Sequence, residues 1–315
     1  MIKGSALRAS KGPPTASVRT KTRPKMNTID VGPTPSPCIV VSPHRLRLLR
    51  VSNLAMATFH GALSVLTLTI GNIGISVPAF ATNIKFLAGN ETTTDLPFEL
   101  QPSYTMLPVG IPFTWIVFAF FLCSCFAHLG NATVWRSVYE SEIGCCRVPT
   151  RWIEYFVSAS LMMLLIAYTA GVREYTLLIA IAGLTASTMP FGWFTEQVAT
   201  VRTPSSWELP LRRRLLPHVI GYVPQTFAWM CVLLSLIDED DKDRAPPWVL
   251  GIVCAELALF WSFGLVQLGQ QLSMPINYFY GEVAYHVLSL TAKGALGGVM
   301  LVNILIYDTF EEAFD

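Results

Sequence analysis

Seven long apolar segments in this chain of 315 residues limit it to a small set of folds. Each is about 20 residues long or longer, which is the length that an α-helix needs to cross the hydrocarbon core of a bilayer. Of all residues, 52% are hydrophobic and only 14% are charged, which also indicates a membrane protein. The predicted fold is an all-α bundle of seven transmembrane helices. The predicted spans are residues 51–80, 109–135, 148–172, 175–199, 215–237, 248–272 and 282–307.

The basic residues predict how the bundle is inserted. Ten lysines and arginines precede the first span against one acid, Asp30, and further arginines lie in loops on the same side. The opposite side is rich in acids, including the run DEDDKD at 238–243 and the C-terminal residues. By the positive-inside rule, we expect a cytoplasmic N-terminus and a C-terminus on the outside.

Composition divides the chain into three parts. Residues 1–42 are rich in Pro, Ser, Thr and basic residues, and they are predicted to be a disordered cytoplasmic tail. Residues 43–308 form the membrane domain, and residues 309–315 form an acidic outer tail. Within the long loop at 81–108, β-branched and aromatic residues between Pro and Gly favour a short hairpin, and Asn90 begins a glycosylation sequon.

Lys293 lies near the middle of the last span, in an otherwise uncharged run. At about 1.5 Å rise per residue, it is roughly 16 Å from one end of the run and roughly 22 Å from the other, too far for its side chain to reach either interface. An ionisable group at that depth is expected to be neutral, paired or covalently modified. A buried lysine amine is also the group that forms a Schiff base with a carbonyl compound.

Glu154 is the best carboxylate partner for Lys293 among the acids in the spans. It lies about one and a half turns into the third span, at a depth of roughly 9 Å from the same side, so the two side chains can meet. The alternative is a purely structural ion pair between helices. Glu196 and Glu282 are interpreted as solvated or structural carboxylates at the inner interface.

Four motifs, on four of the predicted spans, carry a resemblance to a known family. They are RWIEY at 151–155, FGWFTE at 191–196, SFGLVQ at 262–267 and GEVAYHVLSLTAK at 281–293. In this order they resemble the heliorhodopsins, which are retinal-binding, rhodopsin-like seven-helix bundles of inverted topology. The resemblance covers about residues 50–306 and leaves out the basic tail.

The resemblance implies that Lys293 binds all-trans retinal as a protonated Schiff base, with Glu154 as the counterion. A carboxylate favours the charged form of an imine in a medium of low dielectric constant. Ser289, one turn before Lys293, can hydrogen-bond this ion pair. The implied function is light sensing rather than enzymatic catalysis, with an unidentified signalling partner and a homodimer as in related proteins.

The family also suggests residues for a pocket and for holding a proton. His60 and His128 resemble an inner polar cluster that can hold or relay a proton, the alternative being neutral, hydrogen-bonded histidines. Apolar and aromatic residues are expected to line a slot for the polyene, although each is individually more often a packing residue. The expected pocket residues are Met163, Tyr168, Trp193, Phe260 and Phe263.

Two residues depart from the family pattern. Glu256 stands in the sixth span where an apolar residue is expected, and His286 stands two turns before Lys293 where an aliphatic residue is usual. Together with Glu154 and His128 they suggest a discontinuous proton route, so the alternative function is a light-activated proton transporter or channel, as some viral members of the family are thought to be. The competing interpretation places Glu256 at a polar outer cavity or a subunit interface.

Overall fold

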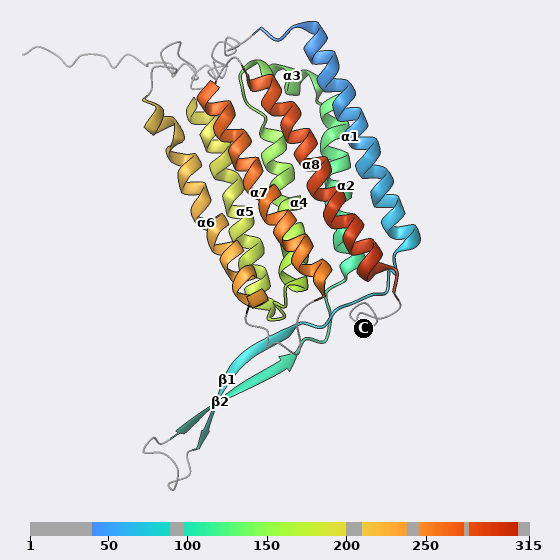
Figure 1. Cartoon of the computed structure of the whole chain (residues 1–315), viewed down its shortest axis with the longest axis vertical. Helices are drawn as coiled ribbons and strands as arrows, with labels where there is room; N and C mark the ends of the chain where they lie inside the picture. Colours follow the sequence, from blue (N-terminus) through green and yellow to red (C-terminus); the bar gives the residue numbers. More distant parts are fainter. Residues whose placement is uncertain (1–39, 89–97, 200–209, 238–245, 274–276, 308–315) are drawn as a thin grey trace, which may run out of the picture. The chain divides into compact units, whose positions relative to one another are not determined.

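The computed structural model describes residues 40–88, 98–199, 210–237, 246–273 and 277–307, which all belong to one compact unit. Seven of the helices in these ranges are long and apolar enough to cross a membrane, which confirms the predicted number of spans. They lie side by side in one bundle (Figure 1). The bundle consists of α1 (Pro43–Ile70), α2 (Phe113–Ala132), α4 (Pro149–Thr169), α5 (Tyr175–Ala199), α6 (Leu211–Ile237), α7 (Pro247–Ser273) and α8 (Tyr278–Met300), which continues into a π-helical turn, η2 (Leu301–Leu305).

Some predicted features lie outside the described residues. These are the tail before residue 40, the sequon at Asn90, the acidic run at 238–243 and the acidic residues from 308 to 315.

The first span begins and ends earlier than the sequence indicated. Helix α1 starts at Pro43 rather than at residue 51, because the Ser42 side chain accepts a hydrogen bond from the Arg45 amide (3.4 Å) and proline suits the first helical position. The helix ends at Ile70 rather than at residue 80, since the backbone becomes extended at Gly71. The predicted ends were wrong because the apolar run continues beyond the helix, and hydropathy does not detect caps.

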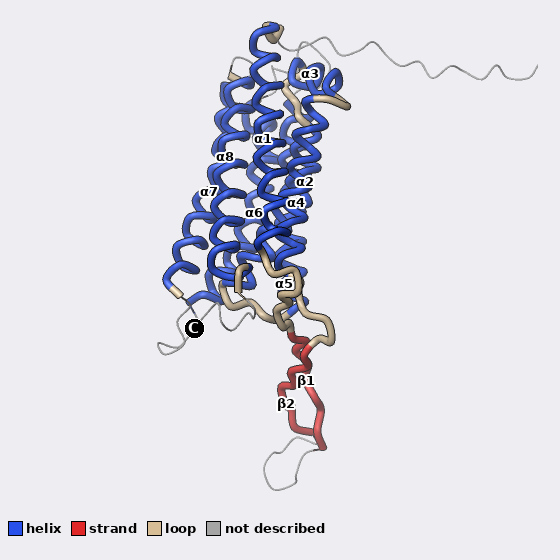
Figure 2. Tube along the Cα trace, turned by 90° about the vertical axis from the view of Figure 1, so that its right-hand side faces the viewer, coloured by secondary structure: helices blue, strands red, loops and turns tan. Residues whose placement is uncertain are grey.

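A two-stranded hairpin lies at one end of the bundle, as predicted for the long loop (Figure 2). It consists of β1 (Phe80–Ala88) and β2 (Phe98–Met106), which pair antiparallel with Phe80 opposite Met106. The Phe80 amide donates a hydrogen bond to the Arg173 carbonyl (3.0 Å), in the connection between α4 and α5. This contact fixes the base of the hairpin to the helices, and we call this end of the bundle the hairpin end.

At the opposite end, the short helix α3 (Arg136–Gly144) connects α2 to α4. It was not predicted, because its nine residues contain three charges and no long apolar run. Its buried residues Tyr139 and Ile143 belong to the same hydrophobic cluster as Leu49 of α1 and Tyr278 of α8. Helix α3 therefore packs against the ends of two spans, and we call this end the α3 end.

Glycines let aromatic side chains pack closely between the helices. A Cβ atom at Gly192 of α5 would collide with the ring of Trp152 on α4, and one at Gly297 of α8 would collide with Phe121 on α2. Small residues of this kind are common where membrane helices meet, because helix association in lipid depends on close van der Waals contact. The Gly192 contact also holds the Trp152 ring in place beside the site described next.

Candidate functional site

Lys293 and Glu154 form a buried ion pair between α8 and α4. The Nζ atom of Lys293 lies 3.0 Å from Oε1 of Glu154, and the two side chains are 3% and 4% exposed. Lys293 also donates a hydrogen bond to Oγ of Ser289 (3.0 Å), and Ser124 of α2 donates one to the Glu154 carboxylate (2.6 Å). Each charged group thus has an ionic partner and a hydroxyl partner, as buried charges require. The structure brings the three predicted residues together and adds Ser124, which no sequence signal indicated.

The aromatic ring of Tyr155 lies beside the lysine nitrogen. The centre of this ring is 4.9 Å from Nζ of Lys293, within the range of a cation–π contact. Tyr155 directly follows Glu154 on α4, so one turn of this helix supplies both the counter-charge and an aromatic wall. The Tyr155 ring in turn packs edge-on against Phe263 of α7, with centroids 5.3 Å apart.

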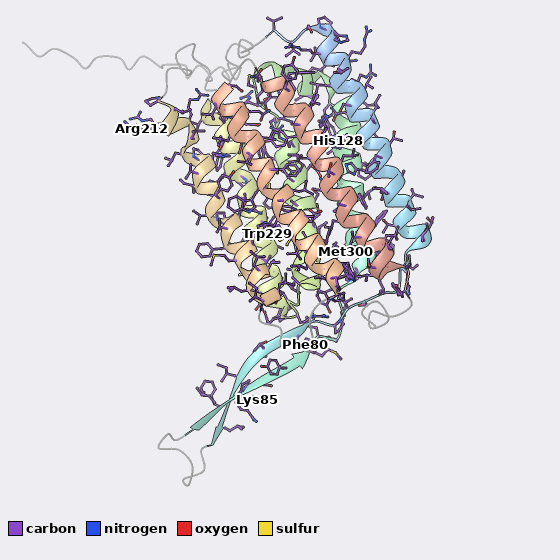
Figure 3. All side chains as sticks on the ribbon, in the orientation of Figure 1. Phe80, Lys85, His128, Arg212, Trp229 and Met300 are labelled. Atoms are coloured by element: carbon purple, nitrogen blue, oxygen red, sulfur yellow. The ribbon has the colours of Figure 1, made fainter. Side chains whose placement is uncertain are left out.

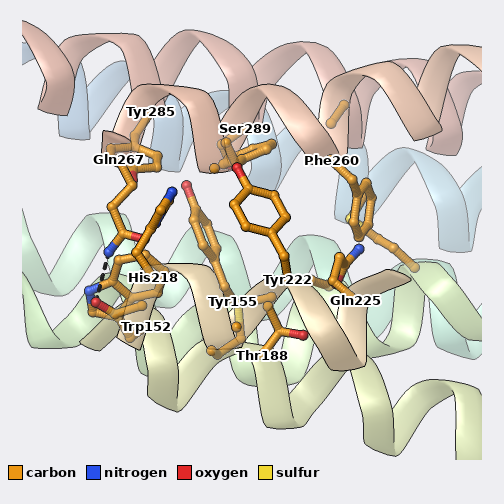
Figure 4. A pocket seen from close by; sticks show the side chains of 18 of the residues that line it. Trp152, Tyr155, Thr188, His218, Tyr222, Gln225, Phe260, Gln267, Tyr285 and Ser289 are labelled. Carbon is orange, nitrogen blue, oxygen red and sulfur yellow. Dashed lines mark hydrogen bonds between the residues drawn. The ribbon is translucent and has the colours of Figure 1, made fainter. Parts of the chain in front are cut away.

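An apolar cavity extends from Lys293 across the bundle to α6 (Figure 4). The cavity has a volume of about 100 Å³. Helices α4 to α8 all contribute to its walls, which are largely aromatic. An amine at the wall of such a slot fits an elongated apolar molecule that carries a carbonyl group. The aromatic lining residues are Trp152, Tyr155, Tyr222, Phe260, Phe263 and Tyr285.

Two of the predicted pocket residues line this cavity and three do not. Those that line it are Phe260 and Phe263; those that do not are Met163, Tyr168 and Trp193. On α4 it is Met162 that faces the cavity, whereas Met163 is buried in the main hydrophobic core. Trp193 is 37% exposed and stacks on Phe194. A shift of one residue turns a helical side chain by about 100°, so apolar patterning alone did not distinguish these neighbours.

At the α3 end, Arg151 of α4 is paired with two buried glutamates. They are Glu196 of α5 and Glu282 of α8, and their side chains are 0% and 2% exposed. Glu196 also accepts hydrogen bonds from the Trp152 indole (2.8 Å) and the Val148 amide (3.0 Å). Of the two interpretations made from sequence, the solvated one is wrong, and the structural one holds. The sequence did not reveal this cluster because its members come from three helices.

Three histidines lie next to one another between this cluster and the lysine. The rings of His60 and His128 are stacked with centroids 5.8 Å apart, and His128 meets His286 edge-on at 5.1 Å. His286 forms a hydrogen bond through Nδ1 with Ser52 (2.7 Å), and its Nε2 lies 3.7 Å from Glu282. The structure therefore brings the three predicted histidines together.

Glu256 is separate from this row of histidines. It is fully buried in α7, and neither carboxylate oxygen has a hydrogen-bond partner within the part of the chain that the structure describes. It does not line the cavity, and it precedes the lining residue Phe260 by one turn on the side of the hairpin end. The predicted relay residues thus fall into two groups, with the histidines on the α3 side of the cavity and Glu256 on the hairpin side.

Comparison with protein families matches the chain to the heliorhodopsin model over residues 49–305. The chain belongs to the heliorhodopsin family. This heliorhodopsin is therefore a retinal-binding, light-responsive protein, and its seven helices make it an integral membrane protein with several spans. The amine, the carboxylate and the aromatic slot at Lys293 fit the chemistry of that ligand. A comparison with curated proteins gave no match.

Solved structures of other microbial rhodopsins share the fold of this heliorhodopsin. A cyanorhodopsin from the cyanobacterium Tolypothrix superposes with a TM-score of 0.52 at 12% identity, covering 88% of this chain and 100% of the other. The transmembrane domain of the Salpingoeca rosetta rhodopsin phosphodiesterase gives 0.53 at 13% identity, with 85% and 90% covered. The light-driven proton pump of Coccomyxa subellipsoidea gives 0.52 at 13%, with 84% and 98% covered. At such identities the likeness concerns the fold alone.

Proposed function

We propose that this heliorhodopsin is a sensory photoreceptor in which Lys293 carries all-trans retinal as a protonated Schiff base and Glu154 is the counterion. The observation that supports this most is the 3.0 Å contact between Lys293 and Glu154 at the wall of an aromatic cavity. Retinal bound there supplies the absorption of light and a polyene that isomerises. An unidentified partner protein and a homodimer remain part of this proposal.

The residues around the lysine nitrogen have distinct tasks. Glu154 balances the positive charge, and its Oε1 is the nearest carboxylate acceptor for a proton that leaves the nitrogen. Ser124 orients that carboxylate by donating a hydrogen bond to it, and Ser289 accepts a hydrogen bond from the Lys293 nitrogen. Both charged side chains are buried, which strengthens the interaction between the two charges.

A sensory role fits the lack of hydrogen bonds, among the described residues, between Glu256 and the ionisable residues on the α3 side of Lys293. The histidines and Glu282 form a row on the α3 side of Lys293, whereas Glu256 has no hydrogen-bond partner among the described residues. Proton transport through a membrane protein uses chains of ionisable groups. Among the described residues, no hydrogen-bonded chain therefore leads from Lys293 to Glu256.

The alternative function is a light-activated proton transporter or channel that uses Glu256 and His286. One observation favours it: a fully buried carboxylate without a partner in the described structure is costly, and such residues in membrane proteins commonly serve ion pathways. This function requires a rearrangement that connects Glu256 to the cavity in the light.

Photocurrent recording in voltage-clamped cells separates the two functions. We expect no light-induced current at any voltage in cells whose membranes contain the coloured protein. A current that reverses with the proton gradient, is abolished by Glu256→Gln and is retained by the surface control Glu140→Gln would contradict the sensory proposal and establish transport.

We infer that the α3 end faces the cytoplasm. Among the described residues, most arginines lie at the α3 end, where Figure 3 labels Arg212, whereas Arg173 and the labelled Lys85 lie at the hairpin end. This distribution agrees with the positive-inside rule. In a cysteine-free background, a membrane-impermeant maleimide should label Thr105→Cys on intact cells and Ser137→Cys only after permeabilisation; the reverse pattern would overturn the orientation. The basic residues at the α3 end are Arg45, Arg47, Arg50, Arg136, Arg147, Arg151, Arg212, Arg213 and Arg214.

A further inference from the structure

The wall of the cavity that is formed by α6 carries a buried amide without a hydrogen-bond partner in the described part of the chain. Gln225 lines the cavity and is 6% exposed, and neither its Oε1 nor its Nε2 atom has a hydrogen-bond partner among the described residues. Figure 4 shows Gln225 beside Phe260, at the opposite end of the cavity from Trp152 and Gln267. Buried amides in folded proteins are nearly always hydrogen-bonded. We therefore expect a molecule that enters the cavity to supply the hydrogen-bond partner of Gln225.

Gln225 and Lys293 lie on different walls of the same cavity. Lys293 belongs to α8 and Gln225 to α6, and α7 lies between these two helices in the bundle. A ligand that is held at Lys293 and fills the cavity therefore also contacts α6, and we place its ring at the end where Gln225 lies. At this end Thr188 of α5 also lines the cavity, and its hydroxyl hydrogen already goes to the Leu184 carbonyl (3.1 Å), which leaves an oxygen lone pair as an acceptor.

The side chains of Gln225 and Thr188 offer hydrogen bonds that a ligand ring made only of carbon and hydrogen cannot use. An unsubstituted ring offers no hydrogen bond, so the amide would stay unsatisfied, and that state is unfavourable in a buried site. A ring hydroxyl can donate to Oε1 of Gln225 or to Oγ of Thr188 and can accept from Nε2 of Gln225, whereas a ring ketone can only accept.

We propose that Gln225 binds an oxygen substituent on the ring of the ligand, so that the site favours a ring-oxygenated retinal over the unsubstituted one. This inference rests on the proposed function, since it assumes that Lys293 holds the other end of the ligand. Gln225 is then a specificity-determining residue of the same site. One hydrogen bond gained in a buried site corresponds to a dissociation constant about tenfold lower for the oxygenated ring than for the unsubstituted ring.

The test uses the full-length apoprotein in nanodiscs and two ring fragments, β-ionone and its 3-hydroxy derivative. Their binding is measured by quenching of tryptophan fluorescence, and the ratio of their two dissociation constants is compared between wild type and Gln225→Leu. Both proteins meet the same lipid, so differences in partitioning cancel in this comparison. The matched control is Gln271→Leu. It changes another buried amide that has no hydrogen-bond partner among the described residues, and Gln271 does not line the cavity.

We expect the ratio to shift by about tenfold toward the unsubstituted ring in Gln225→Leu and to stay unchanged in Gln271→Leu. Equal ratios in wild type and Gln225→Leu would overturn the inference, because water or another group would then satisfy the amide. If Gln225→Leu does not fold, the wild type is titrated with retinal and 3-hydroxyretinal, and an equal yield of pigment in direct competition likewise overturns it. Pigment formation by the same proteins with retinal and with 3-hydroxyretinal reports on the proposed function. Colour without ring selectivity contradicts the inference alone, and no colour with either retinal contradicts the function.

Discussion

Arg151 of α4 and Glu282 of α8 form a buried ion pair in which the two side chains are 5% and 2% exposed. The same guanidinium is paired with Glu196 of α5, so one cation joins three helices at the α3 end. Buried ion pairs are strongly destabilising when one partner is removed, because the remaining charge stays buried without compensation. The cluster therefore acts mainly as a structural anchor beside the site.

Replacing Arg151 should destabilise the bundle. Arg151→Ala leaves two buried carboxylates without their cation, at an expected loss of about 3–5 kcal/mol in the free energy of unfolding. The exposed control Arg212→Ala should change it by less than about 0.5 kcal/mol. Unfolding of the purified protein in mixed detergent measures both variants, and equal stabilities would mean that the Arg151 cluster has no structural role.

Two glycines on α5 should respond differently to the same substitution. A Cβ at Gly192 collides with the Trp152 ring, so Gly192→Ala should cost about 1–3 kcal/mol, whereas a Cβ at Gly183 meets nothing within 4 Å. Gly183→Ala should be neutral or stabilising by up to about 1 kcal/mol, since alanine favours a helix. Thermal denaturation of the two variants tests this contrast, and a Gly192→Ala protein as stable as Gly183→Ala would contradict the close packing of Trp152.

Glu174, in the connection before α5, should give a small pH-dependent contribution to stability. Burial alone would raise the pKa of its carboxyl, but hydrogen bonds from the Thr176 hydroxyl and the Leu177 amide lower it overall. A lowered pKa in the folded state stabilises the protein above the unfolded pKa, and this contribution is lost as the pH falls through the folded value.

The stability difference between wild type and Glu174→Ala should therefore be present at neutral pH and shrink below about pH 4. It should stay below about 1 kcal/mol, because the group is partly exposed to solvent and its charge is screened. Unfolding measured across this pH range tests the sign, and a difference that grows in acid would contradict it.

Removing the Glu154 charge should change the colour of the retinal-loaded protein. In Glu154→Gln the positive charge on the Lys293 nitrogen loses its partner at 3.0 Å, so either the absorption moves to longer wavelength or the nitrogen deprotonates and the visible band disappears at neutral pH. Absorption spectra over a pH titration record either result. A spectrum and titration like those of the wild type and of the surface control Glu140→Gln would mean that another group is the counterion.

Several features were predictable because they depend on distance along a helix. The seven spans follow from the length and hydropathy of the segments. The meeting of Lys293 and Glu154 followed from their depths, since the constant rise of a helix converts residue numbers into levels in the membrane. The contact of Ser289 with Lys293 was predictable because Ser289 precedes Lys293 by four residues, which is about one helical turn.

Other features depend on how each helix is rotated, which one sequence does not specify. For this reason Met162 rather than Met163 lines the cavity, and Trp193 faces away from it. The pairing of Arg151 with two glutamates on other helices was missed for the same reason. The ends of α1 depended on Ser42 and Gly71, which are local cap signals outside the hydropathy profile.

The most direct test of the account is reconstitution of the purified apoprotein with all-trans retinal. Wild type and the surface control Lys85→Ala should form a pigment that absorbs visible light, and reduction with borohydride should fix the retinal to a peptide that contains Lys293. Lys293→Ala should stay colourless. A visible pigment in Lys293→Ala, or retinal fixed to a different peptide, would contradict the assignment of Lys293 as the attachment site.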